Sequence, residues 1–234
     1  MLKAEAQWIG RVLRQTDASQ LTPLLNVGSS TREFREKVQP WIDREIFTPL
    51  QARGIAVHHL DIQEDAGVDL RGDLTDDSFV AGLATRGYRA LLCCNLLEHV
   101  PAPAAIAAKL ERIVPPGSYL VITVPNRFPW HPDPIDTMFR PSPEELGKIF
   151  PSCRIVRAEV LPCGTGWDYV ERNPFKLITK VCRRIAGRKD YGGMKGTTSF
   201  LPWLFRGFRQ TCLLLQKDEV LAGSTESTTP AESR

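Results

Sequence analysis

The chain has 234 residues, a length that suits one large domain better than two. Hydrophobic residues make up 42% of the chain and charged residues 24%, the ordinary balance of a globular protein, which excludes the disordered, fibrous and membrane-spanning classes. The formal net charge of +3 is too small to indicate a nucleic-acid partner, and no such partner is expected.

The start of the chain and its cysteines indicate a reducing compartment. The opening residues 1–15 lack the apolar core of a secretory signal, and no run approaches the roughly 18 apolar residues of a membrane span, so we expect a cytoplasmic protein. The six cysteines form no Cys-x-x-Cys pair and no regular framework. They are therefore expected to be reduced and mostly buried, and the sequence predicts no metal site.

Short apolar runs alternate with helix-like stretches through the first half of the chain. The helix expected over 104–114 has apolar residues at helical spacing and ends at the Pro-Pro-Gly of 115–117. This alternation favours a parallel sheet covered by helices. The expected strands are 21–28, 54–61, 88–95 and 117–125.

Past residue 125 the pattern changes. A loop rich in proline and aromatic residues, 126–143, precedes a helix that Ser142 caps and that continues to Phe150. The last two strands are expected over 153–162 and 209–217, with the final strand antiparallel. The sequence thus predicts one domain over 1–221 and a disordered tail over 222–234.

A basic and aromatic segment, 163–208, separates the last two strands. Ten Lys or Arg residues lie between Arg172 and Arg209, against one acidic residue. The part 175–185 places apolar residues along one side of a helix and basic residues on the other. Four interpretations stay open: a helix packed on the sheet, a lid over the substrate, a surface for a phosphorylated or acidic acceptor, or a peripheral contact with the inner face of an anionic membrane through 175–208.

Polar residues follow the expected strands where ligands bind in an open α/β sheet. The first turn, from Asn26 to Thr31, has the single glycine Gly28 and several hydroxyls, whereas a dinucleotide fingerprint needs three glycines. Asp61 ends the second strand and can accept hydrogen bonds from ribose hydroxyls. A short strand expected over 67–74 ends in Asp73 and is third in chain order. Asn95, Glu98 and His99 lie at the end of the fourth strand, 88–95, and just beyond it.

These motifs, taken together, resemble those of the class I S-adenosylmethionine-dependent methyltransferases, in that family's order. The resemblance covers residues 20–130, and its most specific part is the pairing of Asn95-Leu-Leu-Glu-His-Val with Pro116-Gly-Ser-Tyr-Leu-Val-Ile-Thr-Val-Pro-Asn. It implies a Rossmann-like seven-stranded, mostly parallel sheet with helices on both faces and an antiparallel last strand. It also implies S-adenosyl-L-methionine as cofactor, with binding residues Asn26, Gly28, Ser29, Asp61, Asp73, Leu74 and Asn95.

The chain departs from the family's pattern in the first turn. Asn26 stands where the family usually has an acid, and Ser30 and Arg32 stand where it usually has its second and third glycines. The long interval from Gly28 to Asp61 implies an extended first helix around 33–50. A scaffold that keeps the fold and has lost the cofactor therefore remains an alternative, and a nicotinamide oxidoreductase is a third.

Methyl transfer from a sulfonium is an in-line displacement that depends mainly on positioning. If the acceptor is a hydroxyl, a base helps by taking its proton, and the candidates are His131, His99, Asp133 and Asp136. His131, in the loop after the fifth strand, is preferred; the alternative is that this loop only forms turns and packs. The predicted function is methyl transfer to a small-molecule, glycan or lipid-linked acceptor.

Overall fold

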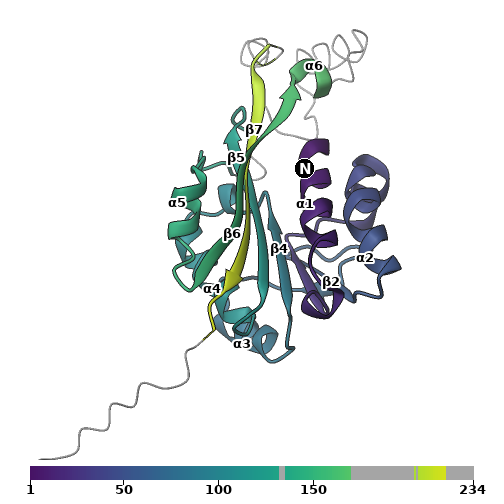
Figure 1. Ribbon diagram of the computed structural model, residues 1–234, viewed down its shortest axis with the longest axis vertical. Helices are drawn as coiled ribbons and strands as arrows, with labels where there is room; N and C mark the ends of the chain where they lie inside the picture. The colour runs from purple at the N-terminus through teal and green to yellow at the C-terminus, as the bar shows by residue number, and fades with distance from the viewer. Residues whose placement is uncertain (132–134, 170–202, 204, 220–234) are drawn as a thin grey trace, which may run out of the picture.

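A seven-stranded sheet forms the centre of the protein. The computed structural model describes residues 1–131, 135–169, 203 and 205–219. The strand order is β3-β2-β1-β4-β5-β7-β6, and β7 runs antiparallel to both of its neighbours (Figure 1). The predicted fold class is thus confirmed. The strands are β1 (Leu24–Val27), β2 (Val57–Asp61), β3 (Leu70–Arg71), β4 (Ala90–Cys94), β5 (Tyr119–Arg127), β6 (Cys153–Thr165) and β7 (Gly207–Lys217).

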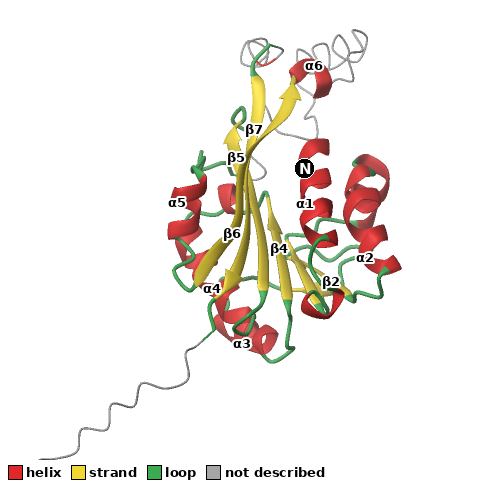
Figure 2. Ribbon diagram, in the orientation of Figure 1, coloured by secondary structure: helices red, strands yellow, loops and turns green. Residues whose placement is uncertain are grey.

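Helices cover both faces of this sheet (Figure 2). One layer contains α1 (Lys3–Arg14), two π-helical turns, η2 (Phe34–Val38) and η3 (Asp43–Phe47), and α2 (Thr48–Ala52). The opposite layer contains α3 (Asp77–Ala84), α4 (Pro103–Ile113) and α5 (Pro143–Lys148). The short helices are η1 (Ala18–Gln20), η4 (Leu97–His99) and α6 (Gly166–Tyr169).

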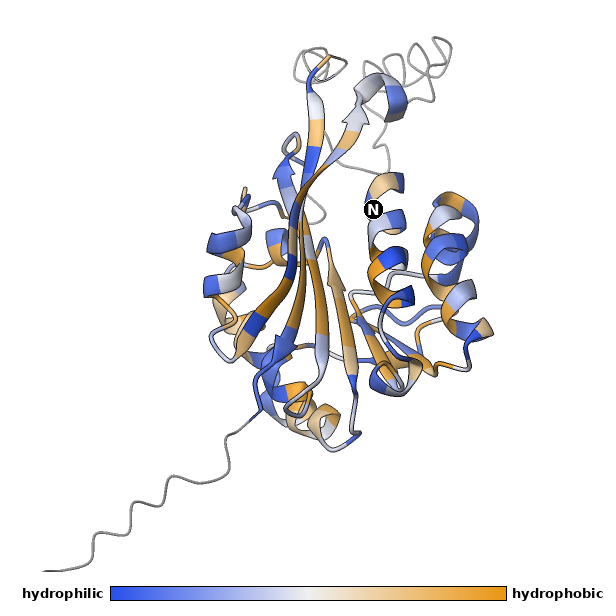
Figure 3. Ribbon diagram, viewed as in Figure 1, coloured by the Kyte–Doolittle hydropathy of each residue, from blue (hydrophilic) through white to orange (hydrophobic). Residues whose placement is uncertain are grey.

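The central strands are apolar on both faces because each face packs against a helical layer. In β1, Leu25 and Val27 join the cluster under α3 and α4, while Leu24 joins the cluster under α1. Alternate residues of β4 divide in the same way. This double burial explains the uninterrupted apolar runs of the sequence, and Figure 3 shows the central strands largely in orange, the colour of hydrophobic residues.

The predicted elements differ from the structure at several boundaries. The extended helix expected around 33–50 is interrupted at Pro40, which has no amide hydrogen to donate and is followed by separate helical turns. The strand expected over 67–74 pairs only at Leu70–Arg71, so Asp73 lies in the turn beyond it. The helix α1 was not among the predicted elements.

Several predictions fall on residues outside the described ranges: the amphipathic helix at 175–185, most of the 163–208 segment, the tail at 222–234 and Asp133. Within the described part of the chain, the cysteines are free thiols and no helix has the length and apolar character to cross a membrane.

Candidate functional site

Four neighbouring parallel strands, β2, β1, β4 and β5, end at the same edge of the sheet. Most of the predicted site residues lie at or just beyond the ends of these strands, while Asp73 and Leu74 follow β3 and Asp133 lies outside the described residues. In an open α/β sheet this edge is where ligands bind.

The turn after β1 leaves its backbone open to a ligand. Gly28 is exposed and has φ +66°, and a Cβ placed on it would lie 3.2 Å from Cδ1 of Leu96. Ser30 also has a left-handed φ of 55°, at one of the positions where the resemblance leads us to expect glycine. Ser30 thus has a left-handed backbone conformation that glycine would adopt with less steric strain.

Arg35 stabilises this turn through hydrogen bonds to its backbone. Its guanidinium donates to the carbonyl oxygens of Ser29 at 3.0 Å, Ser30 at 2.6 Å and Gly67 at 2.8 Å. The side chain is buried, and this desolvation lowers the pKa of Arg35 from its usual value. The sequence analysis missed Arg35, since nothing in the local pattern distinguishes it from a surface residue of the helix.

Asp61 lies beside the same turn, at the end of β2. Its carboxylate accepts hydrogen bonds from the backbone N–H of Ser30 at 2.7 Å and of Gln63 at 3.1 Å. Asp61 is partly exposed, so the carboxylate is both fixed in position and open to a further donor. The structure thus brings Asp61 together with the turn after β1.

Asp73 and Leu74 differ in their surroundings. Asp73 is exposed, and its carboxylate accepts a hydrogen bond from the N–H of Thr75 at 2.8 Å. The side chain of Leu74 is only 8% exposed and belongs to the hydrophobic core. Of this pair, Asp73 therefore presents its side chain at the surface, two residues beyond Arg71, the β3 partner of Asp61, and Leu74 offers mainly its backbone.

Asn26 contacts the neighbouring strand. It is buried, and its Nδ2 lies 3.0 Å from Nδ1 of His59, its register partner on β2. Burial, together with the nearby charge of Arg35, lowers the pKa of His59 to about 4. His59 is therefore neutral near pH 7 and can accept a hydrogen bond from the Asn26 amide.

A buried polar network connects Asn95 with the N-terminal helix. Asn95, which has φ 54°, donates from Nδ2 to Oε1 of Glu5 at 2.7 Å. Oε1 of Glu5 also accepts from Oγ1 of Thr123 at 2.6 Å, and Oε2 accepts from Gln210 at 3.2 Å. Gln210 also donates to Asn95. Glu5 and Gln210 are further residues of the site that the sequence analysis missed.

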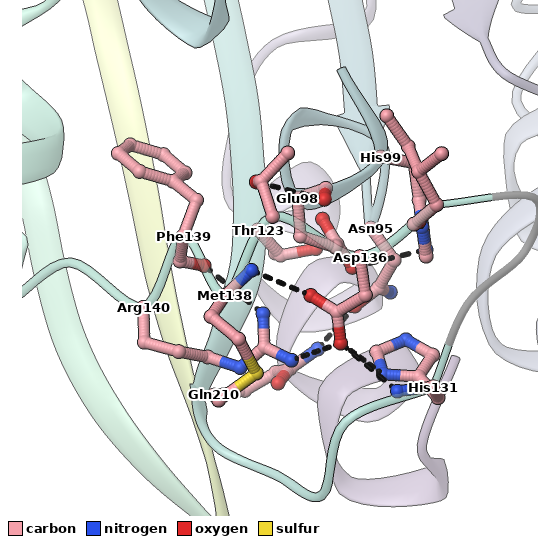
Figure 4. A network of polar contacts seen from close by, with 12 residues as sticks. Asn95, Glu98, His99, Thr123, His131, Asp136, Met138, Phe139, Arg140 and Gln210 are labelled. Carbon is pink, nitrogen blue, oxygen red and sulfur yellow. Dashed lines mark hydrogen bonds and ion pairs between the residues drawn. The ribbon is translucent and has the colours of Figure 1, made fainter. Parts of the chain in front are cut away.

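The histidines predicted as bases lie together at the ends of β4 and β5 (Figure 4). The ring centroids of His99 and His131 are 5.1 Å apart, and Nε2 of His99 is 3.7 Å from Oε1 of Glu98. Glu98 is fully buried, and this desolvation raises its pKa to about 8. Two segments 32 residues apart in the chain thus contribute to one polar cluster.

His131 is oriented by Asp136. Its Nδ1 lies 3.2 Å from Oδ2 of Asp136, and its backbone N–H donates to the same oxygen at 2.9 Å. Arg140 also donates to this oxygen, at 2.7 Å. Desolvation is the main cause that lowers the pKa of His131 from its usual value. Asp136 also accepts from the backbone N–H of Met138 at 2.9 Å, a contact that the alternative, a loop that only forms turns and packs, expects as well.

Aromatic rings continue from the histidines along the same side of the site. Phe128 contacts His131 with a centroid distance of 5.0 Å, and Phe208 contacts Phe128 at 4.9 Å. Trp203 stacks on Phe208 at 5.9 Å. Trp130, in the same loop as Phe128, is exposed, whereas Phe208 is buried. The arrangement offers an apolar surface next to polar groups, as small-molecule sites do.

The chain is similar to known proteins in a short stretch of sequence and over most of the structure. No family model matches it. The ubiquinone biosynthesis O-methyltransferase of Xanthomonas oryzae pv. oryzae is 34% identical over 68 residues, which are 29% of this chain and 28% of that protein. The chain therefore matches less than a third of the length of this curated relative.

Similar solved structures cover most of the chain. Coclaurine N-methyltransferase bound to N-methylheliamine and S-adenosylhomocysteine has a TM-score of 0.56 and 13% identity, covering 92% of this chain and 70% of its own. A SAM-dependent methyltransferase from Archaeoglobus fulgidus has a TM-score of 0.51 and 16% identity, covering 91% and 94%.

The cyclase SpnF has a TM-score of 0.52 and 14% identity, covering 89% of this chain and 80% of its own. Because a cyclase is among these structures, the similarity establishes the architecture and leaves the reaction to the residues of the site. The strand order and these comparisons show that the chain has the fold of the class I S-adenosylmethionine-dependent methyltransferases.

Proposed function

We propose that the protein is an S-adenosylmethionine-dependent methyltransferase that acts on a small-molecule, glycan or lipid-linked acceptor. The observation that carries this proposal is the pairing of an exposed glycine turn after β1 with the fixed carboxylate of Asp61 after β2. The Ser30 N–H to Asp61 hydrogen bond of 2.7 Å joins the two. The methyltransferases among the similar proteins support the same conclusion.

The residues present fit the proposed cofactor. A Cβ at Gly28 would fill part of the space in front of Leu96, so the glycine keeps a cradle open at the strand end. Asp61 would accept the ribose hydroxyls, Asp73 with the backbone of Leu74 would contact the adenine, and Gly28, Ser29 and Asn26 would line the methionine part. Asn95 would border the pocket on the β4 side. When bound, the cofactor supplies a methyl group on a sulfonium.

The acceptor side of the site is assigned to the histidines and the aromatic row beside them. His99 and His131 are the groups that act on the proton of an acceptor hydroxyl, and Asp136 positions His131. Asp133 lies in the same loop and remains a candidate from the sequence alone. The apolar side chains near His131 favour an acceptor with an apolar body and a polar reacting group.

A non-catalytic scaffold is the second candidate, and one observation favours it. Ser30 occupies a left-handed position where the resemblance leads us to expect glycine, so its Cβ adds strain and bulk to the turn. A protein that no longer bound the cofactor would tolerate such a change at no functional cost.

Transfer of a labelled methyl group tests the proposal. The protein is incubated with S-adenosylmethionine labelled in its methyl group and, separately, with small-molecule, glycan and lipid fractions of a cell extract. We expect label in one fraction, and at least a tenfold lower rate with His131→Gln, since a positioned base contributes about 10²–10⁴-fold. No label in any fraction, together with no binding of S-adenosylmethionine by the folded protein, would instead support the scaffold.

A further inference from the structure

We infer that Glu98, His99 and His131 form a binding site for a divalent transition-metal ion. One ligand atom from each side chain lies within 4.8 Å of the others, and Glu98 is buried. The binding of the ion does not depend on the proposed methyl transfer, although its use in the reaction does. The absence of a cysteine framework does not bear on this site, because its donors are two imidazoles and a carboxylate.

The carboxylate of Glu98 needs a partner. Its side chain has no exposed surface, and neither oxygen forms a hydrogen bond with any group in the described part of the chain. Its nearest basic atom is Nε2 of His99, 3.7 Å from Oε1, which is beyond hydrogen-bond distance. Burial without a hydrogen bond disfavours the charged form of Glu98, and a cation between these atoms would replace its proton and give both oxygens a partner.

Both histidines are oriented as metal ligands are. Nδ1 of His99 lies 2.5 Å from the carbonyl oxygen of Ile135. Nδ1 of His131 lies 3.1 Å from the carbonyl oxygen of Pro129 and 3.2 Å from Oδ2 of Asp136. Donation from Nδ1 to a carbonyl or carboxylate fixes the tautomer in which Nε2 carries the free lone pair. Each ring therefore has Nε2 available for an ion, and the partner at Nδ1 makes that nitrogen more basic.

The donors select the kind of ion. Two imidazole nitrogens and one carboxylate suit zinc and its transition-metal neighbours, whereas magnesium prefers oxygen ligands. Zinc bonds of about 2.1 Å place tetrahedral ligands roughly 3.4 Å apart. The present spacing of up to 4.8 Å is wider, so a ring displacement of about 1 Å would close the site.

Three protein ligands leave coordination positions open. If the protein is a methyltransferase, an acceptor hydroxyl could bind there and would lose its proton more easily, because a bound cation lowers the pKa of an attached oxygen. His99 and His131 would then hold the ion rather than take the proton themselves, and the proton of the hydroxyl would pass to solvent water. The aromatic row beside His131 would hold the apolar part of the acceptor.

Metal titration tests the site directly. Untagged full-length protein is stripped with a chelator, dialysed, and titrated with Zn²⁺ by calorimetry and with Co²⁺ by visible absorption. We expect one ion per chain. Glu98→Gln, His99→Gln and His131→Gln should each weaken binding at least tenfold, and the control His58→Gln, on β2, should bind as the original does. Thermal unfolding of each variant shows whether it is folded.

The result that overturns the inference is the absence of stoichiometric binding by the folded protein, or binding that all three ligand variants retain unchanged. S-adenosylhomocysteine is titrated into the same preparation. Cofactor binding without metal binding would reject the metal site alone, and metal binding without cofactor binding would reject the proposed methyl transfer alone.

Discussion

Glu5 of the N-terminal helix accepts a 2.7 Å hydrogen bond from Asn95 at the end of β4, although 90 residues separate them in the chain. Thr123 and Gln210 donate to the same buried carboxylate. The helix α1 is thereby joined to β4, β5 and β7 at the edge where the proposed pocket lies. Glu5 therefore stabilises the packing of α1 on the sheet and also lies next to the proposed pocket.

Removing this carboxylate should destabilise the protein. Glu5→Ala removes the shared acceptor of Asn95, Thr123 and Gln210 from a largely buried network, and we expect the free energy of unfolding to fall by about 3 kcal/mol. Urea unfolding measures this change. Glu64→Ala is the control, because Glu64 pairs with Arg71 at the exposed surface; it should change the free energy by less than about 0.5 kcal/mol. Equal effects of both substitutions would contradict the role given to Glu5.

Ser30→Gly should relieve the turn after β1. The left-handed backbone of Ser30 costs about 1–2 kcal/mol for a residue with a Cβ, and glycine removes this cost while adding freedom to the unfolded chain. We therefore expect the free energy of unfolding to rise by up to about 1 kcal/mol, with tighter binding of S-adenosylhomocysteine. Denaturant unfolding and calorimetry measure the two effects.

The neighbouring Ser29 supplies the control for that substitution. Its backbone is not left-handed, so Ser29→Gly should lower the free energy of unfolding by roughly 0.5–1 kcal/mol. If both glycine variants were destabilised to the same extent, the turn would carry no strain at Ser30.

His59 should make stability depend on pH. Its pKa falls from 6.5 to about 4 on folding, so between these values the unfolded chain binds more protons than the folded one. The contribution of neutral His59 to the free energy of unfolding is present in full above about pH 6.5 and is lost as the pH falls towards 4. Between pH 7 and pH 5 the loss is about 2 kcal/mol. The loss should be smaller by that amount in His59→Gln; an equal loss in both proteins would contradict the assignment.

The sequence predicted the parts of the fold that depend on local patterns. Apolar runs marked β1 and β4 because both of their faces are buried, and the Ser142 cap marked the start of α5, where it forms a capping box with Glu145. The interruption at Pro40 could have been read from the proline itself. The positions of Asp61 and Asn95 followed from their places at strand ends.

The rest of the site depends on contacts between distant segments. Glu5 meets Gln210 across 205 residues, and Arg35 reaches the carbonyl of Gly67 across 32. Nothing near Glu5 distinguishes it from an acidic residue in the first turn of a surface helix. Such contacts become visible only when the topology places the segments side by side.

Binding of S-adenosylhomocysteine tests the central claim most directly, because it requires the pocket and needs no knowledge of the acceptor. The folded protein and Asp61→Ala are titrated side by side by calorimetry, with thermal unfolding as the check that the variant is folded. The account predicts micromolar binding to the original protein and its loss in the variant. No binding by the intact, folded protein would contradict it and would favour a scaffold that has kept the fold without the cofactor.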